Sequence, residues 1–461
     1  MSGPPLPRRK SPVPAGRLGR LLGFGLLAGD IALGTAIEAV RRLTGVEHGP
    51  GTGSLFSARN AAHLVDRLAR LRGAAMKLGQ LLSLEGDDYL PADITGALAV
   101  LRSEAHAMPD AQLRRVLGHA WGRGWERRFR YFGMDPVAAA SIGQVHHGIS
   151  ADGRELALKI QYPGIARSID SDVDNLASVL RLSRLLPGSF DVTAILAEAK
   201  RQLRQEADYR MEADHLRRYR ALLADDSVFV VPAVHDDFTT AHVLAMDYLR
   251  GIRLDEAGGF PQALRNHIGA ALYRLLFREL FEFRFVQTDP NFANFFLLPE
   301  TEQVALLDLG AAREVPAALS QQYAALFAAA VHGERRRVAE AVEAIGFVTP
   351  EDRRDHVDGL VDFFLVACEP FHHRGVYDFG LSTVPPRVRA AGFELTVRRG
   401  FLRPPPPATV FLHRKLAGTF LLCARLGARV DAHAALRPYL DGGPAHLAPR
   451  ASKRTHGGAL D

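Results

Sequence analysis

A chain of 461 residues, 47% hydrophobic and 23% charged, has the composition of a folded protein of two or three domains and excludes a fibrous or wholly disordered chain. Its two cysteines are too few for a disulfide framework or a four-cysteine metal site. Residues 1–20 contain five basic and no acidic residues, so the net charge of +6 leaves only +1 for the rest. The nearly neutral charge of residues 21–461 argues against a nucleic-acid-binding surface.

The first 43 residues differ from the rest of the chain. Residues 1–16 are rich in Pro and Arg and are predicted to be disordered, either attracted to anionic lipid or solvated with no partner. Asp30 divides the apolar run in residues 17–43, which predicts a packed or membrane-surface amphipathic helix rather than a spanning one. A secretory signal is not expected, although an organelle transit leader is compatible. Gly25 and Gly29 are compatible with a helix contact in a dimer.

The apolar pattern predicts helices first, then a small sheet, then a mostly helical region. Helical spacing begins after Ser57 and is expected to continue to about Leu117 and to end at Gly118. Another helix is expected after Tyr162, ending at Pro187, and one long charged helix at 192–223. Strands are expected at 137–160, 228–234 and 242–248, with short pieces at 295–298 and 304–307.

Two acidic motifs carry the clearest chemical signal. Asp289 and Asn294 are five positions apart, and an apolar strand-like run then leads to Asp308 and Gly310. Protein kinases use this arrangement, because Asn294 and Asp308 can hold Mg²⁺ beside a triphosphate while Asp289 orients the attacking hydroxyl or water. The alternative is a structural turn, since Asp, Asn and Pro gather in loops. The strand that ends in Asp308 favours the functional interpretation.

A lysine and a carboxylate-rich helix precede these motifs. Lys159 lies between apolar neighbours in a predicted strand, where an ammonium can contact phosphates if a carboxylate holds it. We assign Glu212 to Lys159. On a straight helix Glu206, Asp208 and Glu212 cannot all face one lysine. We therefore expect Glu206 or Asp208 to pair with a different cation. An edge lysine and a solvated charged helix are the alternatives.

The segment before the lysine strand departs from a typical kinase. Ala138, Ala139, Ala140 and Ser141 stand where a phosphate-covering loop would contain glycines. Their Cβ atoms restrict the backbone, so nucleotide handling is expected to differ.

Four motifs together resemble the UbiB/ADCK family of atypical protein-kinase-like proteins, which are linked to ubiquinone and other prenyl-lipid pathways. They are Lys77-Leu-Gly-Gln80, the alanine-rich segment, Glu206-Ala-Asp208 and the stretch from Gln287 to Asn294. The resemblance covers about residues 17–440, and the stretch from Gln287 is similar to the branch of mitochondrial coenzyme Q regulators.

The resemblance implies an α+β, two-lobed protein-kinase-like fold with a helical N-terminal extension over the cleft. The domains are then expected as a basic leader and amphipathic segment at 1–55, the extension at 56–132, a kinase-like N-lobe at 133–248, a helical C-lobe at 249–441 and a disordered tail at 442–461. In this family the extension covers the cleft where a kinase would bind its peptide. Lys77 and Gln80 would then point into the site and exclude large substrates, with Lys77 as the cation for Glu206 or Asp208.

The resulting hypothesis is an ATP-binding, Mg²⁺-dependent atypical kinase or ATPase that supports ubiquinone or related prenyl-lipid biosynthesis. A small-molecule kinase and a non-catalytic lipid- or enzyme-binding scaffold switched by nucleotide are the alternatives. Catalytic roles are assigned to Asp289, Lys159 and Glu212, metal binding to Asn294 and Asp308, and nucleotide binding to Ala138, Ala139, Ala140, Ser141, Lys159 and Met246. Expected partners are ATP and quinone-biosynthesis enzymes, with a cytoplasmic location and peripheral contact with the inner membrane through residues 17–43.

Overall fold

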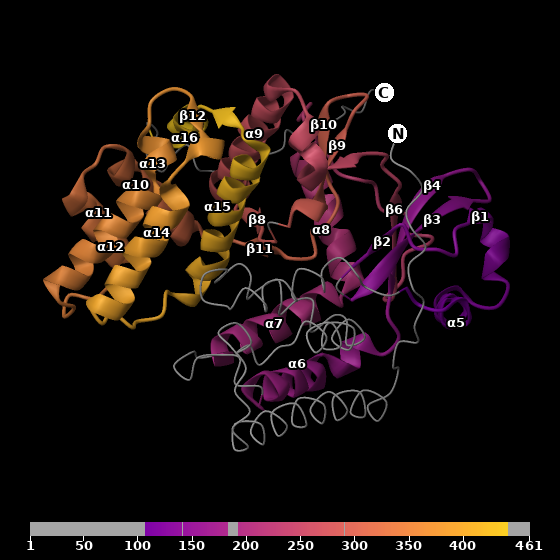
Figure 1. Cartoon of the computed structure of the whole chain (residues 1–461). Helices are drawn as coiled ribbons and strands as arrows, with labels where there is room; N and C mark the ends of the chain where they lie inside the picture. Colours follow the sequence, from indigo (N-terminus) through magenta and orange to yellow (C-terminus); the bar gives the residue numbers. More distant parts are fainter. Residues whose placement is uncertain (1–106, 141, 183–191, 290, 441–461) are drawn as a thin grey trace, which may run out of the picture. The chain divides into compact units, whose positions relative to one another are not determined.

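A computed structural model describes residues 107–140, 142–182, 192–289 and 291–440 (Figure 1). These residues belong to two compact units, one within Met1–Arg218 and Pro232–Leu249, the other within Tyr219–Val231 and Arg250–Asp461. The predicted leader, amphipathic segment and tail lie outside the described residues, as do Lys77, Gln80 and Ser141.

The first unit is built on an antiparallel sheet of five strands among its described residues. The order is β1-β3-β4-β6, with β2 paired to β3. The strands are β1 (Phe129–Phe132), β2 (Ala138–Ala139), β3 (Gly143–Ser150), β4 (Glu155–Gln161) and β6 (Val243–Asp247). Strand β4 lies between β3 and β6 and is buried at six consecutive positions, Leu156 to Gln161, four of which are apolar; Lys159 and Gln161 are the two polar ones.

The helical elements of this unit differ from the expectation at two points. They are α5 (Asp110–Trp121), η1 (Trp125–Arg128), α6 (Ile165–Leu182), α7 (Val192–Glu206) and α8 (Tyr209–Leu222), which continues into the second unit. The predicted stop at Gly118 is wrong, because α5 continues to Trp121 and ends at Gly122, whose φ of +85° suits glycine.

The predicted single helix at 192–223 is also wrong. It is divided between α7 and α8 at Ala207 and Asp208. The carboxylate of Asp208 accepts a hydrogen bond from the backbone N–H of Met211 at 3.0 Å, so it caps the start of α8. Aspartate is among the preferred N-cap residues, because its side chain satisfies an N–H group that has no partner within the helix.

In the part of the second unit that the structure describes there are three small sheets and a large set of helices. One sheet has the order β5-β10-β9-β7, another pairs β11 with β8, and a third pairs β12 with β13. The strands are β5 (Phe229–Val230), β7 (Ile252–Arg253), β8 (Phe285–Gln287), β9 (Phe295–Leu298), β10 (Gln303–Leu306), β11 (Ala312–Glu314), β12 (Tyr377–Asp378) and β13 (Arg429–Val430). Strand β5 pairs in parallel with β10, which explains why residues 219–231 belong to this unit.

Figure 1 shows the helices of the second unit. They contribute buried aromatic side chains such as Tyr273, Phe277 and Phe327, whose rings contact one another. The α-helices are α9 (Gln262–Phe277), α10 (Ala317–Val331), α11 (Arg335–Ile345), α12 (Arg354–Ala367), α13 (Glu369–His372), α14 (Val384–Phe393), α15 (Pro407–Leu426) and α16 (Ala432–Leu436). Shorter helical turns are η2 (Leu254–Gly259), η3 (Arg278–Phe283), η4 (Phe292–Asn294), η5 (Phe379–Leu381), η6 (Glu394–Arg398) and η7 (Arg437–Tyr439).

The strands predicted at 295–298 and 304–307 are confirmed as β9 and β10, which form an antiparallel hairpin. Strands β8, β11, β12 and β13 were not predicted. Each has only two or three residues, too few for an alternating pattern to be recognised. No helix in the described ranges is long and apolar enough to cross a bilayer.

A largely buried histidine in α15, His413, makes the stability of the second unit depend on pH. The ring of His413 stacks on Phe347 with centroids 5.5 Å apart, and its Nε2 shares a 2.8 Å hydrogen bond with the Tyr323 hydroxyl. Burial lowers the pKa of His413 from 6.5 to about 4. The folded state therefore favours the neutral ring, so its contribution is complete above pH 6.5 and is lost as the pH falls towards 4.

Protonation of His413 is expected to lower the free energy of unfolding by about 1–2 kcal/mol between pH 7 and pH 4.5. The loss is smaller than for a fully buried histidine, because His413 keeps partial contact with solvent. Denaturant titrations at both pH values measure this loss. In the neutral variant His413→Gln, which can still hydrogen-bond to Tyr323, the fall should be smaller by that amount. An identical fall in both proteins would contradict the assignment.

Candidate functional site

A buried ion pair lies beside the central strand of the first unit. Lys159 is in β4, and its Nζ lies 2.8 Å from Oε1 and 2.9 Å from Oε2 of Glu212 in α8. The two side chains are 7% and 0% exposed, and the ring centroid of Tyr209 is 5.4 Å from Nζ. The predicted pairing of Lys159 with Glu212 is confirmed. Because both carboxylate oxygens contact it, the ammonium is fixed in direction, which suits contact with an anion.

The alanine-rich segment forms a regular hairpin with β3. Ala138 and Ala139 form β2 and pair with Val145 and Gln144, and the N–H of Ala140 donates to the carbonyl of Gly143 at 2.9 Å. Backbone hydrogen bonds therefore hold this segment to the sheet. The predicted contact of these alanines with nucleotide stays a prediction.

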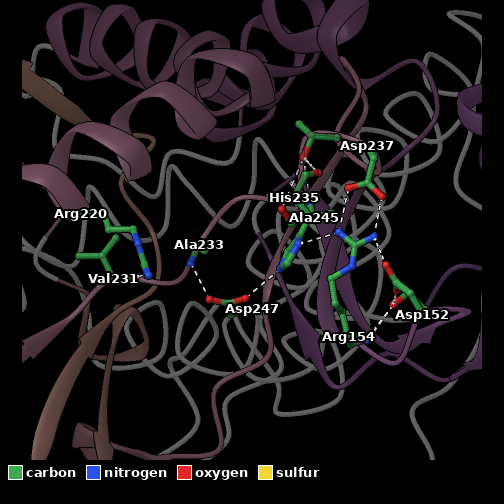
Figure 2. A network of polar contacts seen from close by, with 11 residues as sticks. Asp152, Arg154, Arg220, Val231, Ala233, His235, Asp237, Ala245 and Asp247 are labelled. Atoms are coloured by element: carbon green, nitrogen blue, oxygen red, sulfur yellow. Dashed lines mark hydrogen bonds and ion pairs between the residues drawn. The ribbon is translucent and has the colours of Figure 1, made fainter. Parts of the chain in front are cut away.

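The end of strand β6, which carries Met246, is held by a polar network (Figure 2). Met246 is buried, and the carboxylate of the next residue, Asp247, accepts hydrogen bonds from the N–H of Ala233 and from Nε2 of His235, both at 2.8 Å. Nδ1 of His235 faces a nitrogen of Arg154 at 3.1 Å. Since arginine only donates, Nδ1 accepts this hydrogen bond and Nε2 carries the proton.

Arg154 anchors the outer part of the same network (Figure 2). Its two terminal nitrogens donate to the two oxygens of Asp237 at 3.0 and 2.7 Å, and it also lies 2.8 Å from Asp152. These hydrogen bonds lower the pKa of Asp237 and lower that of Asp152 to about 2. The turn between β3 and β4 is thereby tied to the loop before β6. Sequence reasoning did not predict this network, because its members lie far apart along the chain.

The second unit brings Asp289 and Asn294 together at the end of β8. Asn291 caps the short helix η4 by accepting a hydrogen bond from the N–H of Ala293 at 3.1 Å. This turn directs Asn294 back towards Asp289, whose Oδ2 accepts from the Asn294 amide at 3.3 Å. Because that nitrogen faces Asp289, the amide oxygen of Asn294 is the atom suited to a cation.

The loop that contains Asp308 is joined to the same turn. The N–H of Leu307 donates to the carbonyl of Asn294 at 3.0 Å, and Oδ1 of Asp308 accepts from the N–H of Gly310 at 3.1 Å. The two predicted metal ligands, Asn294 and Asp308, are therefore carried by directly hydrogen-bonded segments. One carboxylate and one amide oxygen fit Mg²⁺, which usually binds one or two protein oxygens together with phosphates and water rather than an all-protein cage.

Two other predicted residues, Glu206 and Asp208, lie at the junction of α7 and α8. Glu206 is buried at the end of α7, and Asp208 caps α8. Their expected partner, Lys77, lies outside the described residues, so this pairing stays a prediction.

Sequence reasoning missed three residues behind the loops of the second unit. Gln287, Glu279 and Lys415 are all buried and lie within one chain of polar contacts. Gln287 had a signal, since it stands two positions before Asp289 in the family motif. Glu279 and Lys415 also had a weak one, because each is a charged residue inside an apolar helical run.

Comparisons with known proteins show which family the chain is similar to. The family model described as the ABC1 atypical kinase-like domain matches residues 100–342. The mitochondrial atypical kinase COQ8B of Rattus norvegicus is 40% identical over 425 residues, which cover 92% of this chain and 80% of that protein. The mitochondrial atypical kinase COQ8 of Saccharomyces cerevisiae is 35% identical over 427 residues, which cover 92% and 84%.

A solved structure is also similar. The complex of Rv3197 with erythromycin from Mycobacterium tuberculosis aligns with a TM-score of 0.60 at 25% identity, and the match covers 84% of this chain and 97% of that one. The predicted α+β, kinase-like fold is confirmed. The family model matches more than half of the chain, and the relatives match most of it. The chain therefore belongs to the ABC1 atypical kinase-like family.

Proposed function

We propose that this protein binds Mg·ATP and acts as an atypical kinase or ATPase in support of ubiquinone or related prenyl-lipid biosynthesis. The observation that carries the proposal is the pair of joined loops in the second unit, which present Asp289, Asn294 and Asp308 from hydrogen-bonded segments. Membership in a kinase-like family and relatives named as mitochondrial atypical kinases of the COQ8 type support the same conclusion.

Each site residue has a role in this proposal. Lys159, fixed by Glu212, contacts the phosphates, while Ala138, Ala139, Ala140, Ser141 and Met246 contact the rest of the nucleotide. Asn294 and Asp308 hold Mg²⁺, and Asp289 orients the hydroxyl or water that attacks. Bound Mg²⁺ neutralises phosphate charge as it develops. Lys77 and Gln80, with Glu206 and Asp208, exclude large substrates and so favour a small acceptor or water.

Changing Asp308 to Asn tests the metal assignment. The substitution keeps the shape of the side chain but removes the negative charge that attracts Mg²⁺, so we expect ATP to bind about tenfold more weakly with Mg²⁺, about 1.4 kcal/mol. Isothermal titration of the purified full chain with ATP, in the presence and absence of Mg²⁺, measures this change. Phosphate release should fall in parallel.

The exposed residue Asp358 in α12 offers a matched control, since Asp358→Asn makes the same chemical change away from the two loops. Unchanged Mg·ATP binding by Asp308→Asn, or no binding by the wild type, would overturn the proposal. The link to prenyl lipids is tested by measuring quinones in a strain that lacks the gene. The wild-type chain should restore them, whereas Asp308→Asn should not.

A further inference from the structure

We propose that Gln287 is a positioning residue that sets the spacing between Asp289 and Asp308, and that the buried pair of Glu279 and Lys415 fixes the backbone of Gln287. The inference rests on the proposed Mg·ATP function, for which Asp289 and Asp308 must stand at a defined separation.

The side chain of Gln287 contacts both candidate loops. Its Nε2 donates to the carbonyl of Asp289 at 2.6 Å and, in a longer and weaker contact, to the carbonyl of Asp308 at 3.4 Å. The next residue adds a second link, because the hydroxyl of Thr288 donates to the carbonyl of Ala311 at 2.6 Å. Thus two consecutive side chains at the end of β8 hold the segment containing Asp289 to the segment that follows Asp308.

Gln287 makes these contacts at a cost. It is only 3% exposed, and its Oε1 has no hydrogen-bond partner among the described residues. Leaving a buried acceptor unsatisfied is unfavourable, and such groups call for an explanation beyond stability. Positioning of the two loops by Nε2 supplies that explanation.

The buried carboxylate of Glu279 contacts the backbone of Gln287. Oε1 of Glu279, in η3, accepts a hydrogen bond from the Tyr219 hydroxyl at 2.8 Å and a longer one from the N–H of Gln287 at 3.4 Å. Oε2 of Glu279 lies 2.7 Å from Nζ of Lys415, and the side chains of Glu279 and Lys415 are 0% and 5% exposed. The desolvation of such a pair offsets much of its attraction, so its contribution is better explained by defined geometry than by stability.

Helix α15, which carries Lys415, also contacts the turn after Asp289. The guanidinium carbon of Arg425, also in α15, lies 5.0 Å from the ring centroid of Phe292 in η4. Lys415 is therefore linked through Glu279 to the backbone of Gln287, and Arg425 contacts the turn that follows Asp289.

The test is the Mg²⁺ dependence of ATP binding in the full chain. In Gln287→Ala the two loops lose their shared contact, so we expect the half-saturating Mg²⁺ concentration to rise about tenfold. Because the ammonium of Lys159 is unaffected, the affinity for ATP without Mg²⁺ should stay within about twofold. The melting temperature should fall, since a buried side chain and the hydrogen bonds of its Nε2 are lost, but a general loss of stability would weaken ATP binding with and without Mg²⁺ alike. A purely structural role would not separate these two affinities.

The buried pair is tested with the double variant Glu279→Gln/Lys415→Met, which removes both charges and can therefore fold without an uncompensated ion. A rise of about threefold or more in half-saturating Mg²⁺ is expected. The control is Leu422→Val, which trims a buried side chain of α15 and should leave the Mg²⁺ dependence unchanged.

The outcomes separate this inference from the proposed function. Wild-type binding of Mg·ATP together with an unchanged Mg²⁺ dependence in Gln287→Ala would overturn the positioning role of Gln287 and leave the proposed function standing. An unchanged dependence in the double variant alone would overturn the role of Glu279 and Lys415. Failure of the wild type to bind Mg·ATP would overturn both proposals.

Discussion

Replacing Lys159 with Met is expected to lower the free energy of unfolding by about 3–5 kcal/mol, because it leaves the charge of Glu212 buried without its partner. Glu212 is fully buried, and both of its oxygens contact Lys159. Adding Glu212→Leu should restore most of the stability, since neither charge of the pair then remains. The double variant should nevertheless bind Mg·ATP weakly, because the cation proposed to contact the phosphates is gone. Denaturant titration and nucleotide titration measure the two effects separately.

Lys200 provides the matched control for this prediction. It pairs with Asp174 at 2.6 Å, but the carboxylate is 63% exposed and stays solvated when the lysine is lost. Lys200→Met should therefore cost less than about 1 kcal/mol and leave nucleotide binding unchanged. Lys159 does not have the assigned role if the double variant binds Mg·ATP as the wild type does, or if Lys159→Met is no less stable than Lys200→Met.

Gly143→Ala is expected to destabilise the protein by about 2–3 kcal/mol, because the added methyl group has no space. A Cβ at this position would lie 2.3 Å from the carbonyl oxygen of Ile160 and 2.9 Å from the hydroxyl of Tyr209. The backbone oxygen cannot move away without disturbing the pairing of β3 with β4, whose register places Gly143 opposite Gln161. Thermal denaturation of the full chain measures the loss.

The same substitution at Gly118 is expected to change the stability in the opposite direction. Gly118 lies within α5, and a Cβ there would meet no atom within 4 Å. Alanine is a better helix former than glycine, so Gly118→Ala should stabilise the protein by about 0.5–1 kcal/mol. Equal effects of the two substitutions would show that close packing at Gly143 is not the cause.

The features that could be predicted from sequence are those that depend on short spacing. Asp289 and Asn294 are five residues apart, so a single turn brings them together whatever surrounds them. The pairing of Lys159 with Glu212 joins residues 53 apart, yet it was predictable because the lysine strand, the carboxylate-rich helix and the Asp/Asn motifs follow in the order found in protein kinases. The strands β9 and β10 were recognisable as two short apolar runs, whereas their pairing as a hairpin was seen only in the structure.

Local sequence also misled in two places. Gly118 looked like a helix stop, but glycine is tolerated inside a helix when no other signal ends it there. The run from 192 to 223 looked like one helix because its charged pattern continues across Asp208. Aspartate is less favourable inside a helix than at its N-cap, and Asp208 is the N-cap of α8.

By itself the sequence determined the family, the kinase-like α+β fold and the chemical identity of the candidate site, because these depend on residue types at short, characteristic spacings. Only the tertiary structure decided which residues support that site. Gln287 forms hydrogen bonds with both loops, and Lys415 in α15 forms an ion pair with Glu279. It likewise decided that Gly143 lies against the backbone of Ile160. Such contacts depend on packing between segments distant in sequence, and neither the apolar pattern nor the local propensity of a residue records which segments will meet.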